Sequence, residues 1–373
     1  MIKCLFLIGN LEGGGAERVL VNLVNNMDTS IFDITVETIF SDGVHRGELS
    51  PSVNYICRKA PYFKGITKIL RFIPSSILYK WIVGKKHYDV VIAYMHGLPT
   101  HIISGCRDKT IKTVTWIHNG DMEHTSLFNS FPSYKSAIKA LISFDRIVPV
   151  AQSIADALKE KTGISDNVTV CYNTNNVDKI VRLSDEPVEL SLNHPIVCSV
   201  GRFTPDKGFE RLIRISHRLH LEGYGHTLLL VGAGRDFEKT KRLASDLGED
   251  VLFSGFDINP YKYMKASDLF VCSSFIEGMC TASVEAIILG KASVSTDVSG
   301  AREILGYNNE YGIVTKMDDE SLYEGLKSMI SDNAQRAYYT QQAKKNAHCF
   351  SVDSTVGAVE RMLEEVVNCP PHN

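Results

Sequence analysis

The stretch that decides the fold is LFVCSSFIEGMCTASVEAIIL, residues 269–289. It begins with four apolar residues, continues through a short loop that holds Glu277 and Gly278, and ends in a pattern typical of a helix. A strand, a loop and a helix in this order form half of a βαβ unit, in which helices join parallel strands. The same order recurs along the rest of the chain.

Short apolar runs alternate with helical patterns on both sides of this stretch. Strands are predicted at residues 2–8, 32–40, 89–94, 113–117, 146–150 and 168–171, and then at 195–200, 226–231, 251–253, 269–272 and 292–295. Runs such as DVVIAY are apolar almost throughout, which is typical of strands covered on both faces of a sheet. The sequence therefore predicts an α/β protein with parallel sheets.

The size and composition of the chain indicate more than one globular domain. The chain has 373 residues, of which 44% are hydrophobic and 22% charged, whereas a single core rarely extends beyond about 250–300 residues. Forty basic and 43 acidic residues give a net charge of −3, which argues against a nucleic-acid partner. No run approaches the roughly 18 apolar residues of a membrane span, and the apolar N-terminus is predicted to be a strand rather than a signal peptide.

The alternation of strands and helices pauses at residues 182–194, which are mostly polar and contain one proline. Segments of this kind connect domains. We therefore predict two α/β domains, residues 1–185 and 186–351, followed by a helical segment, residues 352–373.

Nine cysteines are scattered along the chain without a C-x-x-C pair. Several lie in runs predicted as strands, for example Cys4, Cys198 and Cys272. We interpret the cysteines as buried free thiols of a protein in a reducing compartment. A cysteine metal site or nucleophile is the alternative, and the spacing gives it no support.

Glycines follow the first predicted strand, at residues 13–15, and a helical pattern comes next. A backbone without side chains can approach a ligand closely there, and the start of a helix favours negative charge. The dinucleotide fingerprint G-x-G-x-x-G is not matched, because Asn10, Leu11 and Glu12 occupy its early positions. A tight turn between strand and helix is the structural alternative.

A second loop, GRFTPDKG at residues 201–208, carries Arg202 and Lys207. Two cations at the carboxyl edge of a strand suit a diphosphate, because arginine binds as a fork and lysine as a point charge. Two solvated surface cations are the alternative.

The third loop is the central part of the opening stretch. Glu277 follows the strand, residues 278–281 form the turn into the helix, and Glu285 lies in the first turns of that helix. The free N–H groups at a helix start bind phosphate or sugar oxygens, and a carboxylate accepts hydrogen bonds from the hydroxyl pair of a ribose.

In combination these motifs resemble the family 4 retaining glycosyltransferases of GT-B fold. The resemblance rests on Gly14-Gly15-Ala16-Glu17, Gly201-Arg202 with Lys207-Gly208, Glu277-Gly278 with Glu285-Ala286, and the later residues 290–297 and 300–304. It covers nearly the whole chain, although Lys291 replaces the usual proline and Met279-Cys280-Thr281 replaces the commoner Phe-Gly-Leu. The turn at 278–281 is similar to that of members that build bacterial surface glycans.

The resemblance implies two Rossmann-like parallel-sheet domains that face a central cleft. The first domain would bind the acceptor, the second would bind the nucleotide-sugar, and residues 352–373 would form a helix that crosses back to the first domain.

The resemblance also implies a role for each motif residue. The catalytic residues would be His118, Arg202, Lys207 and Glu277. The donor-binding residues would be Gly14, Gly15, Arg202, Lys207, Ser254, Gly255, Phe256, Glu277, Gly278, Met279, Cys280, Thr281, Ala282 and Glu285. The two cations would bind the diphosphate, Glu285 the ribose, Glu277 the sugar hydroxyls, and residues 254–256 the base.

No metal and no cofactor besides the nucleotide-sugar are expected, because no DxD-like pair lies before or within these second-domain motifs. The acidic run at residues 318–320 is predicted to start a helix. Asp121 and Glu123, near His118, are candidates to assist the acceptor hydroxyl, and a solvated loop is the alternative.

Residues 58–86 contain eight basic residues and no acidic one, interleaved with large apolar side chains. Positions 66, 69, 70 and 73 share one helical face, and positions 77, 78, 81 and 82 share another after Pro74. Basic amphipathic helices lie on anionic membranes, so a peripheral membrane contact is predicted here. Two ordinary surface helices are the alternative.

We therefore expect a metal-independent retaining enzyme at the inner face of a bacterial cytoplasmic membrane. It would transfer a hexose or N-acetylhexosamine from a UDP-sugar to a lipid-linked or oligosaccharide acceptor in surface polysaccharide synthesis. A UDP-sugar epimerase of the same fold and a non-catalytic nucleotide-sugar-binding protein are the alternatives, and product analysis with and without acceptor separates the three.

Overall fold

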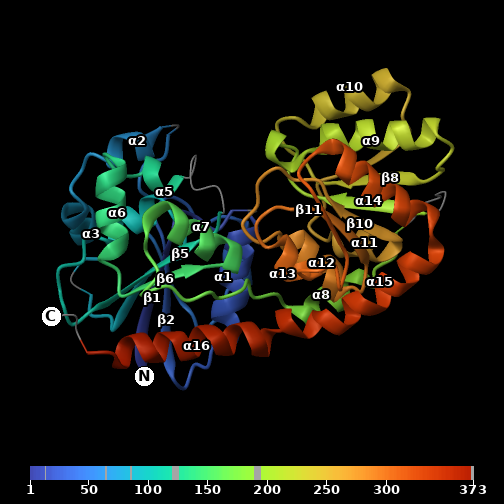
Figure 1. Cartoon of the computed structure of the whole chain (residues 1–373). Coiled ribbons are helices and arrows are strands. Elements are labelled where there is room, and N and C mark those ends of the chain that lie inside the picture. Colours follow the sequence, from blue (N-terminus) through green and yellow to red (C-terminus); the bar gives the residue numbers. More distant parts are fainter. Residues whose placement is uncertain (13, 64, 85, 120–125, 189–194, 371–373) are drawn as a thin grey trace. The chain divides into compact units, whose positions relative to one another are not determined.

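The computed structural model describes the chain except for residues 13, 64, 85, 120–125, 189–194 and 371–373 (Figure 1). It divides into two compact units, Met1–Asn175 with Val352–Asn373, and Asn176–Ser351. The sequence placed the boundary at residue 185, whereas the second unit already begins with helix α8 (Val177–Ser184). This helix packs against α11 (Tyr261–Ala266) and α12 (Thr281–Ile288) of the second unit.

The first unit is built on a parallel sheet in the order β3-β2-β1-β4-β5-β6. Its strands are β1 (Ile2–Ile8), β2 (Phe32–Thr38), β3 (Asn54–Cys57), β4 (Val90–Ala93), β5 (Lys112–Ile117) and β6 (Arg146–Pro149). The predicted strand at 168–171 is not formed as a regular strand, and Val168 makes an isolated bridge to Ile147. The segment nevertheless runs along β6, since the N–H groups of Thr169 and Cys171 donate to Ile147 O and Pro149 O at 3.0 and 3.1 Å. Strand β3 was not predicted, since this short edge strand contains polar residues.

Helices cover both faces of the first sheet. They are α1 (Gly15–Asn26), α2 (Ile66–Leu70), α3 (Ser75–Ile82), α4 (Leu98–Ile103), α5 (Ser126–Asn129), α6 (Tyr134–Ile142), α7 (Gln152–Thr162) and α16 (Val352–Asn368). Helix α16 comes from the far end of the chain and packs against α1. The backbone N–H of Asp28, just after α1, donates to Glu360 Oε1 of α16 at 2.7 Å.

The second unit repeats the same architecture, with a sheet in the order β12-β11-β10-β7-β8-β9. Its strands are β7 (Ile196–Val200), β8 (Thr227–Val231), β9 (Val251–Gly255), β10 (Leu269–Cys272), β11 (Ala292–Thr296) and β12 (Ile313–Thr315). Its other helices are α9 (Phe209–Leu221), α10 (Phe237–Leu247), α13 (Ala301–Leu305), α14 (Asp319–Ser331) and α15 (Asn333–Asn346). Asp318 caps α14 by accepting the Ser321 N–H at 2.7 Å, which confirms the predicted helix start.

Both sheets share one topology once the strands of the second are renumbered from its first strand. Each follows the order 3-2-1-4-5-6, which is the doubly wound arrangement of nucleotide-binding sheets. In such sheets ligands bind beyond the carboxyl ends of the strands, where the strand order reverses. That point lies between β1 and β4 in the first unit and between β7 and β10 in the second.

Among the described residues, no helix combines the length and the apolar character that crossing a membrane requires.

Candidate functional site

Two loops meet at the switch point of the second sheet, one after β7 and one after β10. They are joined by hydrogen bonds: Ser273 Oγ donates to Lys207 O at 2.9 Å, and Phe275 N–H donates to Asp206 O at 2.7 Å. Gly208 makes this contact possible, because its φ is +67° and a Cβ there would lie 2.1 Å from Ser273 O. The structure therefore brings the second and third sequence motifs together.

Lys207 and Glu277 form an ion pair at the centre of this junction. Lys207 Nζ lies 2.7 Å from Glu277 Oε1, and Ser274 Oγ donates to the same oxygen at 2.7 Å. The two side chains are only 19% and 11% exposed. Burial alone would lower the pKa of Lys207, but the charge of Glu277, the hydrogen bond to it and the neighbouring cysteines together outweigh burial, and the pKa is raised. A fixed cation and a fixed carboxylate thus lie side by side at the ligand-binding edge.

The turn from Glu277 into α12 presents backbone rather than side chains. Gly278 and Met279 are buried, and Cys280 precedes the helix without a side-chain cap to the first N–H groups. Gly300, with φ of +79°, packs against this turn, since a Cβ there would be 3.1 Å from Gly278 O. Thr281 and Ala282 supply N–H groups of the first helical turn, which suit an anion.

Glu285 lies one turn further along α12 and is 4% exposed. Its Oε1 accepts a hydrogen bond from the Tyr261 hydroxyl at 3.2 Å. Tyr261 begins α11, and the sequence reasoning did not select it. Nothing in its local pattern distinguishes it from an ordinary buried aromatic residue.

Arg202 and the segment 254–256 lie at the same carboxyl edge of the sheet. Arg202 follows β7 and is exposed, whereas Ser254 and Gly255 end β9, on the far side of β8. Phe256 comes next and is 71% exposed. Ser254 also lines a cavity of about 330 Å³ with Phe253 and other residues of this unit.

Arg211 is a site residue that the sequence reasoning missed. It is buried in α9, and its guanidinium donates to Ser273 O at 2.8 Å, to Ser274 O at 3.0 Å and to Met317 O at 3.0 Å. The same group lies 3.9 Å from the centre of the Phe275 ring. A charged residue on the apolar face of a helix, four positions after Lys207, is the signal that was available.

In the first unit, Gly14 and Gly15 follow β1 and start α1. A Cβ at Gly14 would lie 2.0 Å from Glu17 Oε2, which is the end of a flexible side chain and can move aside. Gly13 lies outside the described residues, as do Asp121 and Glu123.

His118 follows β5 at the carboxyl edge of the first sheet. Its Nε2 lies 2.8 Å from Tyr94 O, so this nitrogen carries the proton and Nδ1 keeps a lone pair. Burial and the neighbouring His96 lower the pKa of His118 to about 3, which keeps the ring neutral. His96 follows β4, and its Nδ1 accepts the His118 N–H at 3.3 Å. The sequence reasoning missed His96, although it follows an apolar strand and precedes a glycine.

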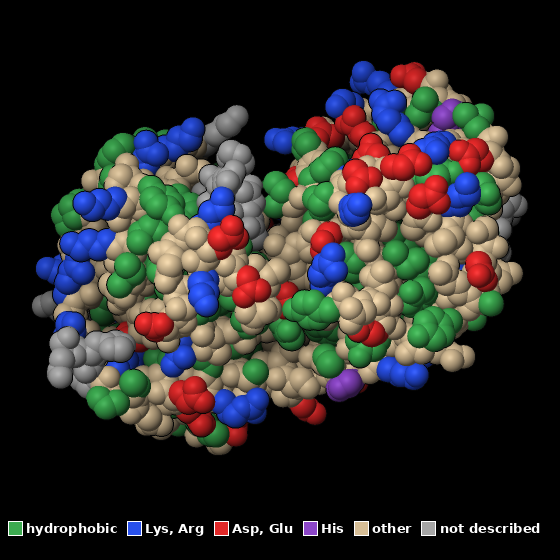
Figure 2. Space-filling view, viewed as in Figure 1, with side chains coloured by type: hydrophobic (Ala, Val, Ile, Leu, Met, Phe, Trp, Pro, Cys, Tyr) green, Lys and Arg blue, Asp and Glu red, His purple; other side chains and the backbone are tan. Residues whose placement is uncertain are grey.

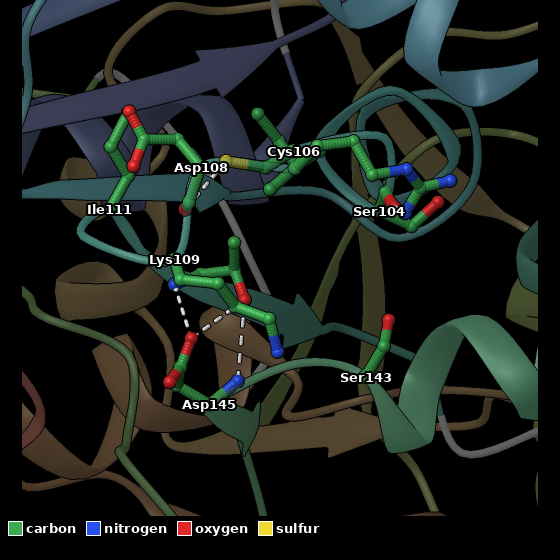
Figure 3. Close-up of a pocket in the computed structure, with 10 residues that line it drawn as sticks. Ser104, Cys106, Asp108, Lys109, Ile111, Ser143 and Asp145 are labelled. Atoms are coloured by element: carbon green, nitrogen blue, oxygen red, sulfur yellow. Dashed lines mark hydrogen bonds between the residues drawn. The ribbon is translucent and has the colours of Figure 1, made fainter. Parts of the chain in front are cut away.

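Two further features lie at the opposite, amino edges of the sheets. In the first unit, a cavity of about 190 Å³ is lined by Ser104, Asp108 and Asp145 among others (Figure 3). The Asp145 carboxylate accepts the N–H and hydroxyl of Thr113 at 2.8 and 2.9 Å. Since this carboxylate holds the start of β5, we interpret the cavity as structural.

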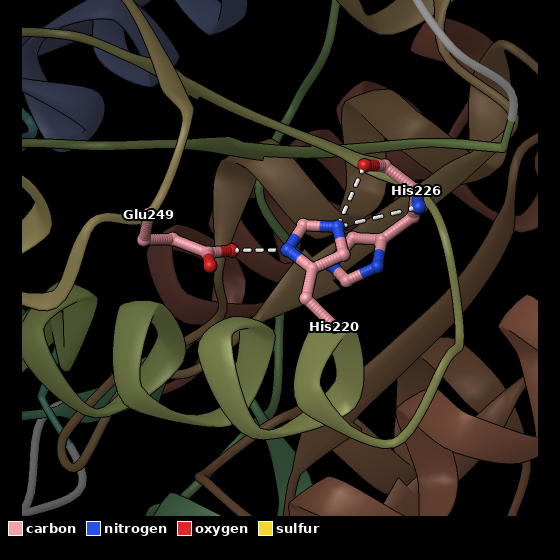
Figure 4. Close-up of side chains that lie close together, drawn as sticks. All are labelled: His220, His226 and Glu249. Atoms are coloured by element: carbon pink, nitrogen blue, oxygen red, sulfur yellow. Dashed lines mark hydrogen bonds and ion pairs between the residues drawn. The ribbon is translucent and has the colours of Figure 1, made fainter.

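Two groups among the described residues have donor atoms close enough to share a metal ion, within 4.8 Å. The first is His220, His226 and Glu249, at the amino edge of the second sheet (Figure 4). Its two imidazole rings are stacked with centres 4.1 Å apart, so their in-plane lone pairs do not converge on one ion. The second group is Cys272, Glu277 and Cys280, in which Lys207 already neutralises the carboxylate.

Two family models match the chain, one over each half. The model described as Glycosyltransferase Family 4 matches residues 13–179, and the model described as Glycosyl transferases group 1 matches residues 181–346.

Curated relatives match over most of their length. The N-acetylgalactosamine-N,N'-diacetylbacillosaminyl-diphospho-undecaprenol 4-alpha-N-acetylgalactosaminyltransferase of Campylobacter jejuni is 28% identical, over 94% of this chain and 96% of the relative. The lipopolysaccharide core biosynthesis glycosyltransferase LpsD of Rhizobium meliloti is 29% identical, over 87% of each chain.

Among solved structures, Anabaena HepE in complex with UDP and glucose superposes with a TM-score of 0.78 at 21% identity. The match covers 98% of this chain and 100% of that one, and it shows the shared two-domain fold. The chain therefore belongs to the glycosyltransferases of GT-B fold, with a family 4 first domain and a group 1 second domain.

Proposed function

We propose that the protein transfers a hexose or N-acetylhexosamine from a UDP-sugar to a lipid-linked saccharide in the synthesis of a bacterial surface polysaccharide. The observation that carries the proposal is the Lys207–Glu277 pair at the switch point of the second sheet. A cation suited to the diphosphate and a carboxylate suited to sugar hydroxyls lie there within hydrogen-bonding distance of each other.

In this proposal the second unit holds the donor. Lys207, Arg202 and the first N–H groups of α12 stabilise the negative charge that develops on the departing diphosphate. Glu277 orients the sugar through its hydroxyls, and Glu285 binds the ribose. The segment 254–256 contacts the base, with the cavity beside Ser254 as the space that accommodates it.

Uridine is proposed as the base because HepE, a structural neighbour, was solved with UDP and glucose. Retention of configuration is proposed from the family resemblance. Metal independence is proposed because Arg202 and Lys207 supply positive charge at the phosphate position.

In the first unit, we propose that His118 contacts the donor sugar. Its Nε2–H is committed to Tyr94 O, so the unprotonated Nδ1 is the atom available to accept a hydrogen bond from a hydroxyl. Gly14 and Gly15 let the loop after β1 approach the donor without side chains.

The lipid-linked acceptor is proposed from the Campylobacter relative, whose name places a diphospho-undecaprenol in its substrate. The surface of residues 58–86 supports it. Large apolar side chains are exposed there, with Trp81 60% exposed, and the exposed apolar set is Tyr62, Phe63, Ile69, Phe72, Ile77 and Trp81. Figure 2 shows Lys and Arg side chains interspersed with hydrophobic ones over the α2 and α3 side of this unit.

The described cations of this surface are not equivalent. Lys59, Lys68, Lys80 and Lys86 are exposed, whereas Arg58 is paired at 2.5 Å with the buried Glu37. Arg58 therefore neutralises a buried carboxylate within the first unit, whereas the exposed lysines are available to bind anionic headgroups.

An apolar cavity of about 230 Å³ lies beneath α2 and α3. Its lining includes Phe40, Ile66, Leu78, Trp81 and Ile102. A cavity of this lining next to exposed lysines suits an amphiphile with an apolar chain and an anionic head.

The donor is tested by a thermal-shift screen of UDP-, GDP- and ADP-sugars. We expect UDP-sugars to raise the melting temperature, and we expect Lys207→Ala and Glu285→Ala to abolish the shift. Lys239→Ala is the matched control, because Lys239 is an exposed lysine of α10 paired with Glu210. A full shift retained by Glu285→Ala would refute the ribose assignment.

The reaction is tested by product analysis with a diphospholipid-linked saccharide, with and without EDTA. We expect an elongated acceptor whose new linkage has the same anomeric configuration as the donor. We expect the same amount of this product with and without EDTA. Free epimerised UDP-sugar without acceptor would identify the epimerase instead, and donor binding without any product would identify a binding protein.

Membrane contact is tested by co-sedimentation with vesicles that contain anionic lipid. We expect the wild type to bind and the double variant Lys68→Glu, Lys80→Glu to stay in solution, whereas Lys239→Glu in the second unit binds as the wild type does. Equal binding by all three proteins would assign the contact to another surface.

A further inference from the structure

Two cysteines stand at the two ends of the loop that carries Glu277. Cys272 is the last residue of β10, and Cys280 is the residue before α12. Their sulfur atoms are 3.8 Å apart, which is within contact distance. The sequence predicted free thiols, and both residues are free in the structure.

The surroundings of the pair favour reaction of one thiol. Cys272 is buried, whereas the residue Cys280 is partly exposed, so the Cys280 side of the pair is the more open one. The contact between the two thiols lowers the pKa of Cys272 to about 6 against the effect of burial, and the same contact raises the pKa of Cys280. The thiolate is the nucleophilic form of cysteine, so the sulfur whose pKa is lowered by its neighbour is the one expected to react first.

We propose that Cys272 and Cys280 are a redox modification site, which a peroxide converts to a disulfide that weakens donor binding. One thiolate attacks a peroxide oxygen, the O–O bond breaks, hydroxide leaves, and a sulfenic acid remains. The second sulfur attacks the sulfenic sulfur and water leaves as the S–S bond forms. In sum, two thiols and hydrogen peroxide give one disulfide and two waters, and a dithiol reagent reverses the change.

The disulfide acts on the site through the loop that it closes. A bond length of about 2.05 Å requires the two sulfurs to approach from 3.8 Å. Cys280 precedes the first turn of α12, so its movement displaces the N–H groups proposed to bind the diphosphate. The same loop carries Glu277, whose pairing with Lys207 depends on the present loop position. The effect on the donor rests on the proposed function, whereas formation of the disulfide does not.

The first test detects the bond itself. The reduced full-length protein is treated with hydrogen peroxide and digested, without reductant, by a protease that cleaves after glutamate. Cleavage after Glu277 separates the two cysteines, so a disulfide leaves their peptides linked, with a mass lower by two hydrogens than the two free peptides together. We expect this linked species, and its loss on reduction. Separate peptides after peroxide treatment would overturn the proposal.

The second test measures UDP affinity before and after peroxide. We expect at least a tenfold loss that dithiothreitol restores, and no loss in Cys272→Ser, which retains Cys280. Cys272→Ala serves if the serine variant does not fold, and Cys349→Ser, a partly exposed cysteine outside the loop, is the matched control that responds as the wild type does.

Each result of the second test decides one part of the proposal. A linked peptide with unchanged UDP affinity would refute the effect on the donor, and a loss that persists in Cys272→Ser would assign it to oxidation elsewhere. If the reduced protein does not bind UDP, the donor proposal fails, and the linked peptide still decides whether the disulfide forms.

Discussion

At the scale of single residues, the site depends on groups that hold other groups in place. Arg211 binds three carbonyl oxygens from two separate segments, and Ser274 shares the Glu277 carboxylate with Lys207. These contacts hold the charged residues that are proposed to face the donor, and charges held in place are the condition for electrostatic stabilisation of a transition state.

Arg211→Lys is expected to weaken UDP binding by about tenfold, since an ammonium group cannot reach the three carbonyls that the guanidinium spans. Titration calorimetry with UDP measures the affinity, and urea unfolding measures the stability. Arg218→Lys on the same helix is the control, because Arg218 makes exposed pairs with Glu222 and Glu320. Equal UDP affinity in wild type and Arg211→Lys would show that the arginine acts on stability alone.

The two buried histidines of the first unit should make its folding stability depend on pH. Burial lowers the pKa of His96 to about 4, and burial with His96 lowers that of His118 to about 3. At pH values below the usual histidine pKa of about 6.5, the two histidines bind protons in the unfolded chain but not in the folded chain. The free energy of unfolding therefore falls as the pH falls from about 6.5 to 4. Each group contributes at most about 1.4 kcal/mol per pH unit.

Urea midpoints at pH values between about 7.5 and 5 measure this dependence, and His96→Asn is expected to reduce its slope. His87→Asn is the control, since His87 is an exposed histidine of the same unit. An identical slope in His96→Asn and the wild type would contradict the assignment.

At the scale of elements, the amino edge of the second sheet is fastened by polar side chains. Glu249, just before β9, accepts a hydrogen bond from Ser216 Oγ at 2.6 Å. His220 Nδ1 lies 2.7 Å from the same oxygen, as Figure 4 shows. His226, just before β8, joins the group through Ser216 at 2.8 Å. The cluster ties α9 to the starts of two strands.

Glu249→Gln is expected to lower the free energy of unfolding by about 1–3 kcal/mol. The carboxylate only accepts hydrogen bonds, whereas the amide would place an N–H donor in this buried cluster. Glu320→Gln is the control, and about 1 kcal/mol or less is expected from its exposed pair with Arg218. Urea unfolding of both variants measures the difference. A smaller effect at Glu249 than at Glu320 would contradict the structural role.

The sequence allowed most elements to be predicted, because continuous apolar runs and glycine-bearing loops mark buried strands and the turns after them. It failed in part at 168–171, where the run VTVC has the composition of a strand and makes backbone hydrogen bonds to β6 but forms only an isolated bridge rather than a regular strand. The site motifs were recognised because each is contiguous. His96, Arg211 and Tyr261 were missed because their neighbours in the site come from distant segments, and only the folded chain places them together.

At the scale of the whole molecule, the first unit is completed by the last helix of the chain. Val356, Val359 and Leu363 of α16 are buried, and α16 packs against α1. Removal of residues 352–373 is therefore expected to expose an apolar face and to cause aggregation during expression.

The yield of soluble protein after this deletion measures the effect. A shorter deletion of 369–373, beyond the end of α16, is the control and should remain soluble. If both truncated chains are equally soluble and equally stable, α16 is dispensable for the first unit.

This arrangement also has a consequence for synthesis. The ribosome makes residues 1–175 first, yet the helix that covers α1 emerges only after the whole second unit has been translated. The second unit is contiguous and can fold as it leaves the ribosome, whereas the first unit must wait with part of α1 uncovered. During this interval the first unit, although synthesised earlier, exposes more apolar surface than the second. Chaperones that bind apolar helices can bind α1 at that stage.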